Sequence, residues 1–365
     1  RLEAIEALEC AQKLHPSDAK APYYLGNLWY DKRQYAEAIA CWEKSVQLDP
    51  AFPTVLRNLA LATFNTLQQE AKAVDYLERA FALDNSDARV LMELDQLYKR
   101  IGRPHQERLD LLEQHLDLVV QRDDLYLERV TLYNQTGAYE KAMQLIDARK
   151  FHPWEGGEGK VPAQYQLCRV ELARQHLRAG NTRAAIGLLQ QCLYYPHNLG
   201  EGKLPGAQEN DFDYWLGVAY AQAGDADKAN FHWERAKDGI QEPAAAIFYN
   251  DQKPDKIFYQ GMALLKLNRP EEACARFDKL IRYGENHLND RIKMDYFAVS
   301  LPDLLIWEDD LTYRNRIHCL YLQGLGHLGK QNAAKALEYL SEAARLDVNH
   351  QGVQLHLMVL KEWMS

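Results

Sequence analysis

One arrangement of small and large apolar residues recurs along most of the chain. Its fixed point is an alanine, which occurs at Ala4, Ala38, Ala73, Ala142, Ala185, Ala229, Ala273 and Ala336. A large apolar residue follows each alanine by four positions, as Leu8, Trp42, Leu77, Ile146, Leu189, Trp233, Phe277 and Leu340. Residues four apart share one face of a helix, so each copy predicts an amphipathic helix that packs through a small residue. Since the first two intervals are 34 and 35 residues, the pattern predicts a stack of helical hairpins.

A second signal lies twelve positions before the alanine, where the chain carries Leu25-Gly26, Leu216-Gly217, Gln260-Gly261 and Gln323-Gly324. This period and residue set resemble those of the tetratricopeptide repeat (TPR) family. The resemblance implies an all-α solenoid, a right-handed superhelix of helical hairpins whose concave face is lined by the first helix of each pair. It implies binding rather than chemistry. In the third hairpin Arg108 and His115 replace small residues, which departs from the family pattern.

The repeats predict a single array over the whole chain. Regular repeats are expected in residues 1–150, repeats with long glycine-rich loops in 151–255, and repeats with an insert near 290–318 and a capping helix in 256–365. The cap is expected as an unpaired helix from His350 to Trp363. Residues 3–14 are expected to form a second helix whose first helix is missing. Together with the absence of an initiator methionine, this predicts a piece of a longer protein.

Asparagine and tyrosine are frequent at the first-helix positions that such a repeat turns into its concave face. These side chains hydrogen-bond to an extended backbone and stack on it, so they favour a peptide or a neighbouring protein domain as the partner. The candidate binding residues are Tyr23, Asn27, Tyr30, Asn58, Asn65, Thr131, Asn134, Arg174 and Tyr214. The alternative interpretation is a solvated concave face.

Two long intervals carry the same loop frame, Pro-x-x-x-Gly-Glu-Gly-Lys-[Val/Leu]-Pro, which begins at Pro153 and again at Pro196. Long loops between helices are more often functional than neutral, and tandem repeats place equivalent loops side by side. We expect the two loops to be ordered neighbours, as structural caps or as a contact surface, with positive φ angles at glycines such as Gly159 and Gly202. The candidate contact residues are Trp154, Glu158, Lys160, Glu201 and Lys203.

The interval from Ala273 to Ala336 is 63 residues, which leaves about 29 beyond one repeat of the family period. The insert alternates charged and aromatic residues, and its candidate contact residues are Asp295, Asp303, Arg314, Arg316 and His318. A helix is expected to open at Ser300-Leu-Pro302-Asp303. Its expected buried residues are Tyr296, Phe297, Leu301, Leu304 and Trp307. Packing against the array, partner binding, and acid/base chemistry in a cleft remain as alternatives.

Composition limits the partners. The net charge is −9 without a basic stripe, which argues against nucleic acid. No apolar run approaches the ~18 residues of a membrane span, and no basic-then-apolar leader opens the sequence, so a cytoplasmic protein without a membrane partner is expected. Six cysteines lack a C-x-x-C pair and favour reduced packing residues over zinc or disulfides. No catalytic residue, metal or cofactor is expected.

Three strings, at residues 151–159, 198–204 and 295–303, resemble the TPR-containing C-terminal half of large bacterial proteins. In those proteins a β-rich N-terminal region comes first, and a link to carbohydrate use is suspected. Two functions remain open. The chain is either a non-catalytic scaffold that cradles a partner protein or an N-terminal domain of the same chain, or an accessory part of a bacterial carbohydrate-active enzyme that contributes loop residues to an active site completed by a missing domain.

Overall fold

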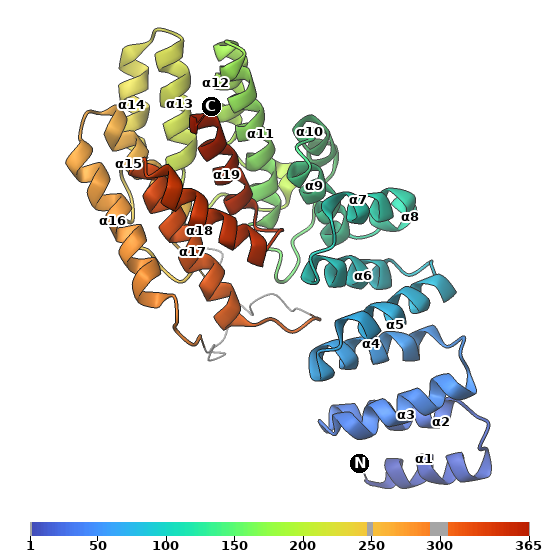
Figure 1. Ribbon diagram of the computed structural model, residues 1–365. Helices are drawn as coiled ribbons and strands as arrows, with labels where there is room; N and C mark the ends of the chain where they lie inside the picture. The colour runs from blue at the N-terminus through green and yellow to red at the C-terminus, as the bar shows by residue number, and fades with distance from the viewer. Residues whose placement is uncertain (1, 247–250, 293–305, 365) are drawn as a thin grey trace. The chain divides into compact units, whose positions relative to one another are not determined.

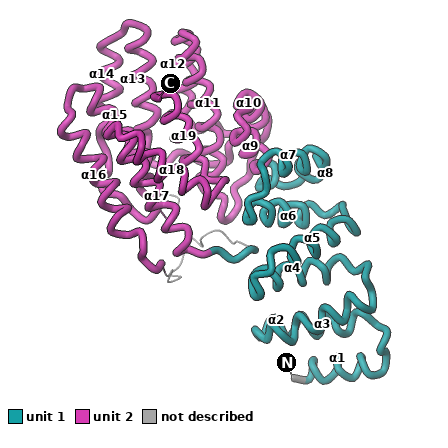
Figure 2. The backbone as a smooth tube through the Cα atoms, in the orientation of Figure 1, with its two compact units in different colours: residues 1–126, 305–309 teal, residues 127–304, 310–365 magenta. Residues whose placement is uncertain are grey.

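The structure is a computed structural model that describes residues 2–246, 251–292 and 306–364. Within these ranges the chain forms helices joined by turns and loops, without a β-strand (Figure 1). The expected all-α solenoid of helical hairpins is therefore confirmed for the described part of the chain. The helices belong to two compact units, unit 1 with residues 1–126 and 305–309, and unit 2 with residues 127–304 and 310–365 (Figure 2).

Unit 1 consists of consecutive helices that pair with their neighbours in the chain. They are α1 (Leu2–Leu14), α2 (Lys20–Asp31), α3 (Tyr35–Leu48), α4 (Pro53–Leu67), α5 (Glu70–Leu83), α6 (Ala88–Arg100), α7 (His105–Gln114) and α8 (Leu116–Val119). Helix α9 (Asp123–Gln135) begins in unit 1 and ends in unit 2. Local sequence fixes several starts: Pro53 occupies the first turn of α4, and the Asp87 carboxylate accepts hydrogen bonds from the first backbone N–H groups of α6.

Unit 2 contains the remaining helices of the chain that the structure describes. They are α10 (Tyr139–Ala148), α11 (Lys160–Arg178), α12 (Thr182–Gln191), the 3-10 turn η1 (His197–Leu199), α13 (Asn210–Gln222), α14 (Ala226–Ala236), α15 (Pro254–Lys266), α16 (Pro270–His287), α17 (Leu311–Gly329), α18 (Ala333–Leu346) and α19 (Gln351–Met364). Helices α11 to α18 form four successive hairpins, in which α11, α13, α15 and α17 are the first helices. The apolar cores of these hairpins merge along the unit.

In four hairpins, a glycine of the first helix explains how closely the two helices approach. A β-carbon on Gly26 would lie 2.5 Å from the Trp42 ring, and one on Gly217 would lie 2.3 Å from the Trp233 ring. The same contact joins Gly261 to Phe277 and Gly324 to Leu340. Any side chain at these glycines would force the helices apart. The pairing of a glycine with a large apolar residue sixteen positions later is thus the physical basis of the repeat.

Arg108 departs from the repeat in sequence but keeps its place in the packing. Its side chain is fully buried between the helices of the third hairpin. The guanidinium donates two hydrogen bonds to the Asp95 carboxylate, from Nε to Oδ1 at 3.0 Å and from Nη2 to Oδ2 at 2.8 Å. Helix α7 then ends at Gln114, and His115 meets Phe81 edge-on. A buried ion pair therefore replaces the alanine contact of the other hairpins.

The last helix, α19, lies where the sequence predicts a capping helix, and it packs on its own unit. It contributes Val353, Val359 and Leu360 to the core of unit 2. It also bonds to the first helix α11, because Gln164 Nε2 donates to Gln351 Oε1 at 2.8 Å and Arg174 Nη2 donates to Glu362 at 2.9 Å. Helix α19 thus lies alongside α11 of its own unit (Figure 1), and its apolar residues belong to the core of that unit.

Candidate functional site

Helices α2 and α4 of unit 1 bring predicted binding residues together. Asn27 Oδ1 accepts hydrogen bonds from Trp42 Nε1 at 3.0 Å and from Asn58 Nδ2 at 3.1 Å. Tyr23 packs beside them against Phe52. Residues seven apart share a helix face, so Asn65 follows Asn58 two turns further along α4. These side chains form a polar row on the first helices of the unit.

A stretch of the same chain, residues 306–309, lies on this row and belongs to unit 1 (Figure 2). Asn65 holds its main chain at two points. Its Nδ2 donates to the carbonyl oxygen of Ile306 at 2.8 Å, and its Oδ1 accepts from the backbone N–H of Glu308 at 2.9 Å. One amide thereby satisfies an acceptor and a donor on either side of Trp307. Such pairing holds an extended backbone whatever its side chains are.

Trp307 is the most buried side chain of the stretch, with 1% of its surface exposed. Its ring meets Phe64 edge-on, with the ring centroids 5.3 Å apart. Its indole N–H donates to the carbonyl oxygen of Glu93 in α6 at 3.0 Å. Burial of the apolar ring stabilises an enclosed tryptophan, and the hydrogen bond of its N–H fixes the orientation of the ring. The expectation that Trp307 is buried is confirmed.

Charged residues complete the site. Arg100 Nη1 donates to Asp309 Oδ1 at 2.7 Å, so the acidic end of the stretch is held by α6. The Glu93 carboxylate is fully buried and pairs with Arg57 and Arg89, which fixes the helix turn that receives Trp307. Burial is the largest cause of the raised pKa of Tyr30, and the charges of Tyr35 and Glu308 add to it. The predicted residue Tyr30 therefore borders the stretch.

The insert differs from the sequence expectation around Trp307. Residues 306–309 are not helical, and α17 starts only at Leu311, where the Asp310 carboxylate accepts from the N–H groups of Thr312 and Tyr313. Asp309 pairs with Arg100, and the candidate contact residues Arg314 and Arg316 are exposed. The expected residues that lie outside the described ranges are Asp295, Tyr296, Phe297, Ser300, Leu301, Pro302, Asp303 and Leu304.

The groove residues Phe64, Glu93 and Arg100, which contact Trp307 and Asp309, are not among the sequence candidates. Their signal was present, because Glu93 and Arg100 are seven apart on α6 as Asn58 and Asn65 are on α4. Extending the row of the first helices from α4 to α6 would have found Glu93 and Arg100, whereas Phe64 directly precedes the candidate Asn65 on α4. The residue types misled, since the candidates are mostly asparagine and tyrosine and include neither phenylalanine nor an acidic residue.

The two glycine-rich loops of unit 2 are ordered neighbours, as predicted. The backbone N–H of Phe151 donates to the carbonyl of Asn198 at 2.7 Å, and that of Gly159 donates to the Glu201 carboxylate at 2.8 Å. Gly159 has a positive φ of 73°. The same expectation for Gly202 is wrong, because Gly200, with a φ of 76°, makes the turn instead.

The loop side chains divide between internal and exposed positions. Trp154 folds over Gly157, where a β-carbon would lie 2.2 Å from its ring. Lys203 pairs with Glu209 and also donates to the carbonyl of Leu193. Glu158 and Lys160 are exposed. Trp154, Glu201 and Lys203 therefore have structural partners within the loops or the adjoining helices.

The predicted groove residues of unit 2 are covered by the chain itself. Asn134 Nδ2 donates to Gln164 Oε1 at 2.9 Å, and Thr131 bonds within its own helix. Arg174 is buried between Glu171 and Glu362 of α19. Tyr214 is buried in the core that includes the apolar residues of α19. The expectation of an open concave face at these positions is wrong for unit 2, because α19 occupies it.

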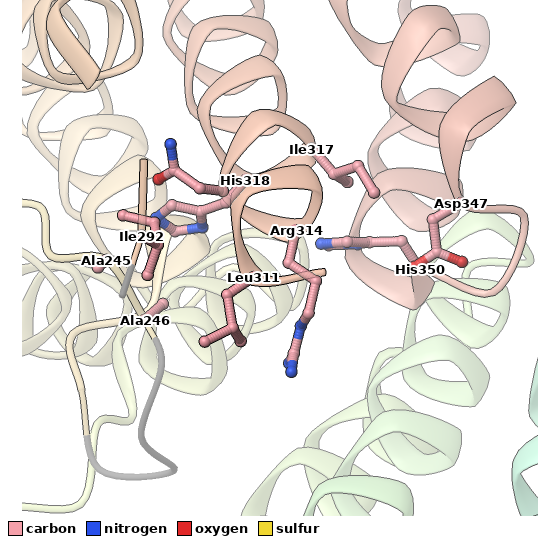
Figure 3. Close-up of a pocket in the computed structure, with 10 residues that line it drawn as sticks. Ala245, Ala246, Ile292, Leu311, Arg314, Ile317, His318, Asp347 and His350 are labelled. Atoms are coloured by element: carbon pink, nitrogen blue, oxygen red, sulfur yellow. The ribbon is translucent and has the colours of Figure 1, made fainter. Parts of the chain in front are cut away.

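Beside α19, unit 2 contains two adjoining cavities. The smaller one, of about 180 Å³, is lined by Leu311, Arg314 and His318 of α17 and by Asp347 and His350 from the turn between α18 and α19 (Figure 3). Burial lowers the pKa of His318 to about 4 and also lowers the pKa of His350, so both imidazoles are neutral near pH 7. The larger cavity measures about 360 Å³.

Nothing in the described residues assembles a metal centre of three or more histidine, cysteine or acidic side chains. In the same ranges, the helices all lack the length or the apolar composition to cross a membrane. The cavities are within or below the size of small-ligand sites, which is about 300–1,000 Å³.

Comparison with known proteins bears on the repeat. A family model described as a TPR repeat matches residues 26–66, and one described as a tetratricopeptide repeat matches residues 257–283. The chain contains tetratricopeptide repeats. The TPR segments include one hairpin of unit 1 and one of unit 2, and each contains a glycine that packs on a large apolar residue, Gly26 on Trp42 and Gly261 on Phe277.

Several proteins resemble this TPR chain. The TPR repeat-containing thioredoxin TTL4 of Arabidopsis thaliana is 34% identical over 95 residues, which are 26% of this chain and 14% of that protein. The TPR protein YrrB, described as having an unusual peptide-binding site, is 15% identical, with 64% of this chain and 91% of that chain covered and a TM-score of 0.35. The structure of Naa15/Naa10 bound to HypK-THB is 11% identical, with 96% of this chain and 58% of that chain covered and a TM-score of 0.45.

Proposed function

We propose that this chain is a non-catalytic protein-interaction scaffold whose unit 1 groove binds an extended peptide segment. TPR repeats in general mediate contacts between proteins, which is consistent with this role. The observation that carries the proposal is the pair of hydrogen bonds from Asn65 to the main chain of Ile306 and Glu308. Because both bonds go to main-chain atoms, the same amide suits any extended peptide, and the neighbouring side chains add selection.

We propose as the source of this peptide another protein or another domain of a longer polypeptide. The second choice is supported by the resemblance of residues 151–159 and 198–204 to the TPR-containing half of large bacterial proteins with a β-rich N-terminal region. A bacterial and cytoplasmic setting is part of the proposal. It is supported by six free thiols, of which those of Cys168, Cys192 and Cys319 are buried, since a reducing compartment preserves thiols.

Selection from a multivalent display of random peptides tests the proposal with the full chain. The wild type should enrich peptides that Asn65→Ala binds about tenfold more weakly or worse, because the variant loses both hydrogen bonds to the peptide main chain. Asn58→Ala is the matched control, since it makes the same change in the same helix at a residue that bonds to Asn27 instead of the stretch. It should retain the enriched peptides. A selection without Asn65-dependent peptides would contradict the proposal.

A second proposal is the accessory role in a carbohydrate-active enzyme, with loop residues completing the site of a missing domain. It is supported by the larger of the two adjoining cavities beside α19, whose lining combines the rings of Tyr259 and Tyr321 with the carboxylate of Asp255. Aromatic faces and a polar edge group suit a sugar ring. Screening the full chain against a glycan array tests it, and an array without a signal that Tyr259→Ala removes would rule it out.

A further inference from the structure

We propose that the unit 1 groove selects partner peptides with a tryptophan followed two positions later by an acidic residue, and that residues 306–309 occupy it as a resident copy of this motif. The inference rests on the proposed function and adds the ligand class and the regulation of the same site. The motif is defined by Trp307 and Asp309, whose side chains are held by the groove.

The resident stretch has the contacts of a bound peptide. It is not helical, and the groove residues that bond to it are remote in sequence. Asn65 lies 241 and 243 positions from its two partners, Glu93 lies 214 positions from Trp307, and Arg100 lies 209 positions from Asp309. One peptide bond beyond Asp309 the chain enters unit 2 at Asp310. The stretch is thus a short segment of unit 1 that is tethered to the rest of the chain at the start of α17.

The pocket for Trp307 selects tryptophan over other apolar residues. A leucine or phenylalanine would fill part of the space but would leave the Glu93 carbonyl without the indole donor that it now has at 3.0 Å. A site built to hydrogen-bond its ligand rejects an analogue without that group more strongly than lost apolar area alone would. Arg57 and Arg89 hold the Glu93 side chain in place, so the α6 turn that carries this carbonyl is fixed.

The acidic position is selected by charge. Arg100 and Asp309 are largely shielded from solvent, with side-chain exposures of 25% and 14%. A hydrogen bond between two ionised groups in such a place is stronger than a neutral one, and a lysine in the peptide at this position would be repelled by Arg100. The residue between, Glu308, is bound through its backbone N–H, so its side chain is less restricted.

A resident copy changes how a partner binds. A short tether gives the copy an effective concentration on the order of mM. A partner peptide then binds with its intrinsic affinity reduced by the fraction of chains whose groove is open. Weak ligands are excluded, and a partner that presents a tighter copy of the motif displaces residues 306–309. The groove therefore binds only those partners whose affinity is high enough to displace residues 306–309.

The test uses the full chain and a fluorescein-labelled synthetic peptide with the sequence of residues 304–311, followed by fluorescence anisotropy. Trp307→Ala removes the resident anchor but leaves the groove helices unchanged, so it should bind the peptide at least about tenfold more tightly than the wild type does. Trp363→Ala, the same change at an exposed tryptophan of α19, should bind as the wild type does. Adding Asn65→Ala to Trp307→Ala should abolish binding, as should alanine in place of the peptide tryptophan.

A milder variant keeps the proposal testable if circular dichroism shows that Trp307→Ala does not fold. Asp309→Ala breaks the pair with Arg100 without opening the tryptophan pocket, and it should strengthen peptide binding several-fold. Equal affinities of the wild type and the folded variants would overturn the resident copy, while Asn65-dependent peptides from display would still support the scaffold. Enriched peptides without tryptophan would overturn the motif. A concentration-dependent dimer that Trp307→Ala abolishes would show exchange between two copies and would overturn binding in cis.

Discussion

Arg108 occupies a position that alanine holds in the other hairpins, and its neighbours explain how a charge is accommodated there. Its guanidinium and the Asp95 carboxylate are both shielded from solvent, with side-chain exposures of 0% and 1%. Two parallel hydrogen bonds join them. Buried pairs of this kind contribute little net stability compared with apolar residues, but either partner becomes costly once the other is removed. The pair therefore makes α6 and α7 depend on each other.

Removing one partner of this pair tests that dependence. Arg108→Ala should lower the free energy of unfolding of unit 1 by about 3–5 kcal/mol, because the Asp95 carboxylate would stay buried without its guanidinium. The double variant Arg108→Met with Asp95→Leu should lose much less, since both charges are removed together. Urea denaturation, monitored through the hydrogen exchange of α6 and α7, measures the difference in the free energy of unfolding. A double variant that is as unstable as Arg108→Ala would show that lost packing, rather than the unpaired charge, lowers the free energy of unfolding.

The paired loops of unit 2 depend on backbone conformation more than on side chains. Gly200 has a φ of 76°, and a β-carbon there would lie 2.6 Å from the carbonyl oxygen of Phe151. Gly202, two positions further in the same repeated string, has no atom within 4 Å of an added β-carbon and no positive φ. The string alone did not distinguish the two glycines. The distinction arises from the contact with the other loop.

Gly200→Ala and Gly202→Ala form a matched pair of variants. Gly200→Ala should destabilise unit 2 by at least about 1–2 kcal/mol, because the left-handed backbone and the Phe151 carbonyl both oppose a β-carbon. Gly202→Ala should stay within about 0.5 kcal/mol of the wild type, as exposed substitutions usually do. Thermal unfolding of both variants at one pH provides the comparison. Equal losses would mean that the loops are held by something other than the Gly200 turn.

Helices were predictable from the sequence where the contacts that define them join residues of the same hairpin. The repeat of alanine with a large apolar residue located the second helices, and glycines such as Gly26 located the first helices, because both follow from contacts inside one hairpin. The positions of residues 306–309 and of α19 were not predictable in this way. Their contacts, such as Trp307 with Glu93 and Glu362 with Arg174, join residues that are 214 and 188 positions apart. No periodic pattern reports such pairs.

At the scale of the whole molecule, both units use segments of the same chain to cover their first helices. In unit 1 this segment is residues 306–309, and in unit 2 it is α19. The two covers differ in their chemistry. The cover of unit 1 is short and bonded through its main chain, which suits exchange with a partner peptide. The cover of unit 2 is a helix whose apolar residues belong to the core, so it stabilises the fold.

The α19 cover also makes unit 2 sensitive to acid. Burial lowers the pKa of His356 in α19 to about 4, as it does for His318 in α17. His356 Nδ1 lies 3.0 Å from the Tyr321 hydroxyl and 2.7 Å from the Gly352 carbonyl, and its Nε2 has no hydrogen-bond partner among the described residues. In the unfolded chain the same imidazole binds its proton near pH 6.5. The unfolded state therefore takes up protons first as the pH falls.

The stability of unit 2 should accordingly be complete above pH 6.5 and decline as the pH falls from 6.5 toward 4, by up to ~3 kcal/mol for each histidine. His356→Phe keeps an aromatic ring beside Phe258 and Tyr259 but cannot titrate, so its stability should fall less over the same range. Buried carboxyl groups such as that of Glu171 are common to both proteins and cancel in the comparison. Hydrogen exchange of α17 and α19, corrected for the intrinsic rate at each pH, measures the opening free energy. Parallel pH profiles of the two proteins would show that His356 is protonated without opening the cover.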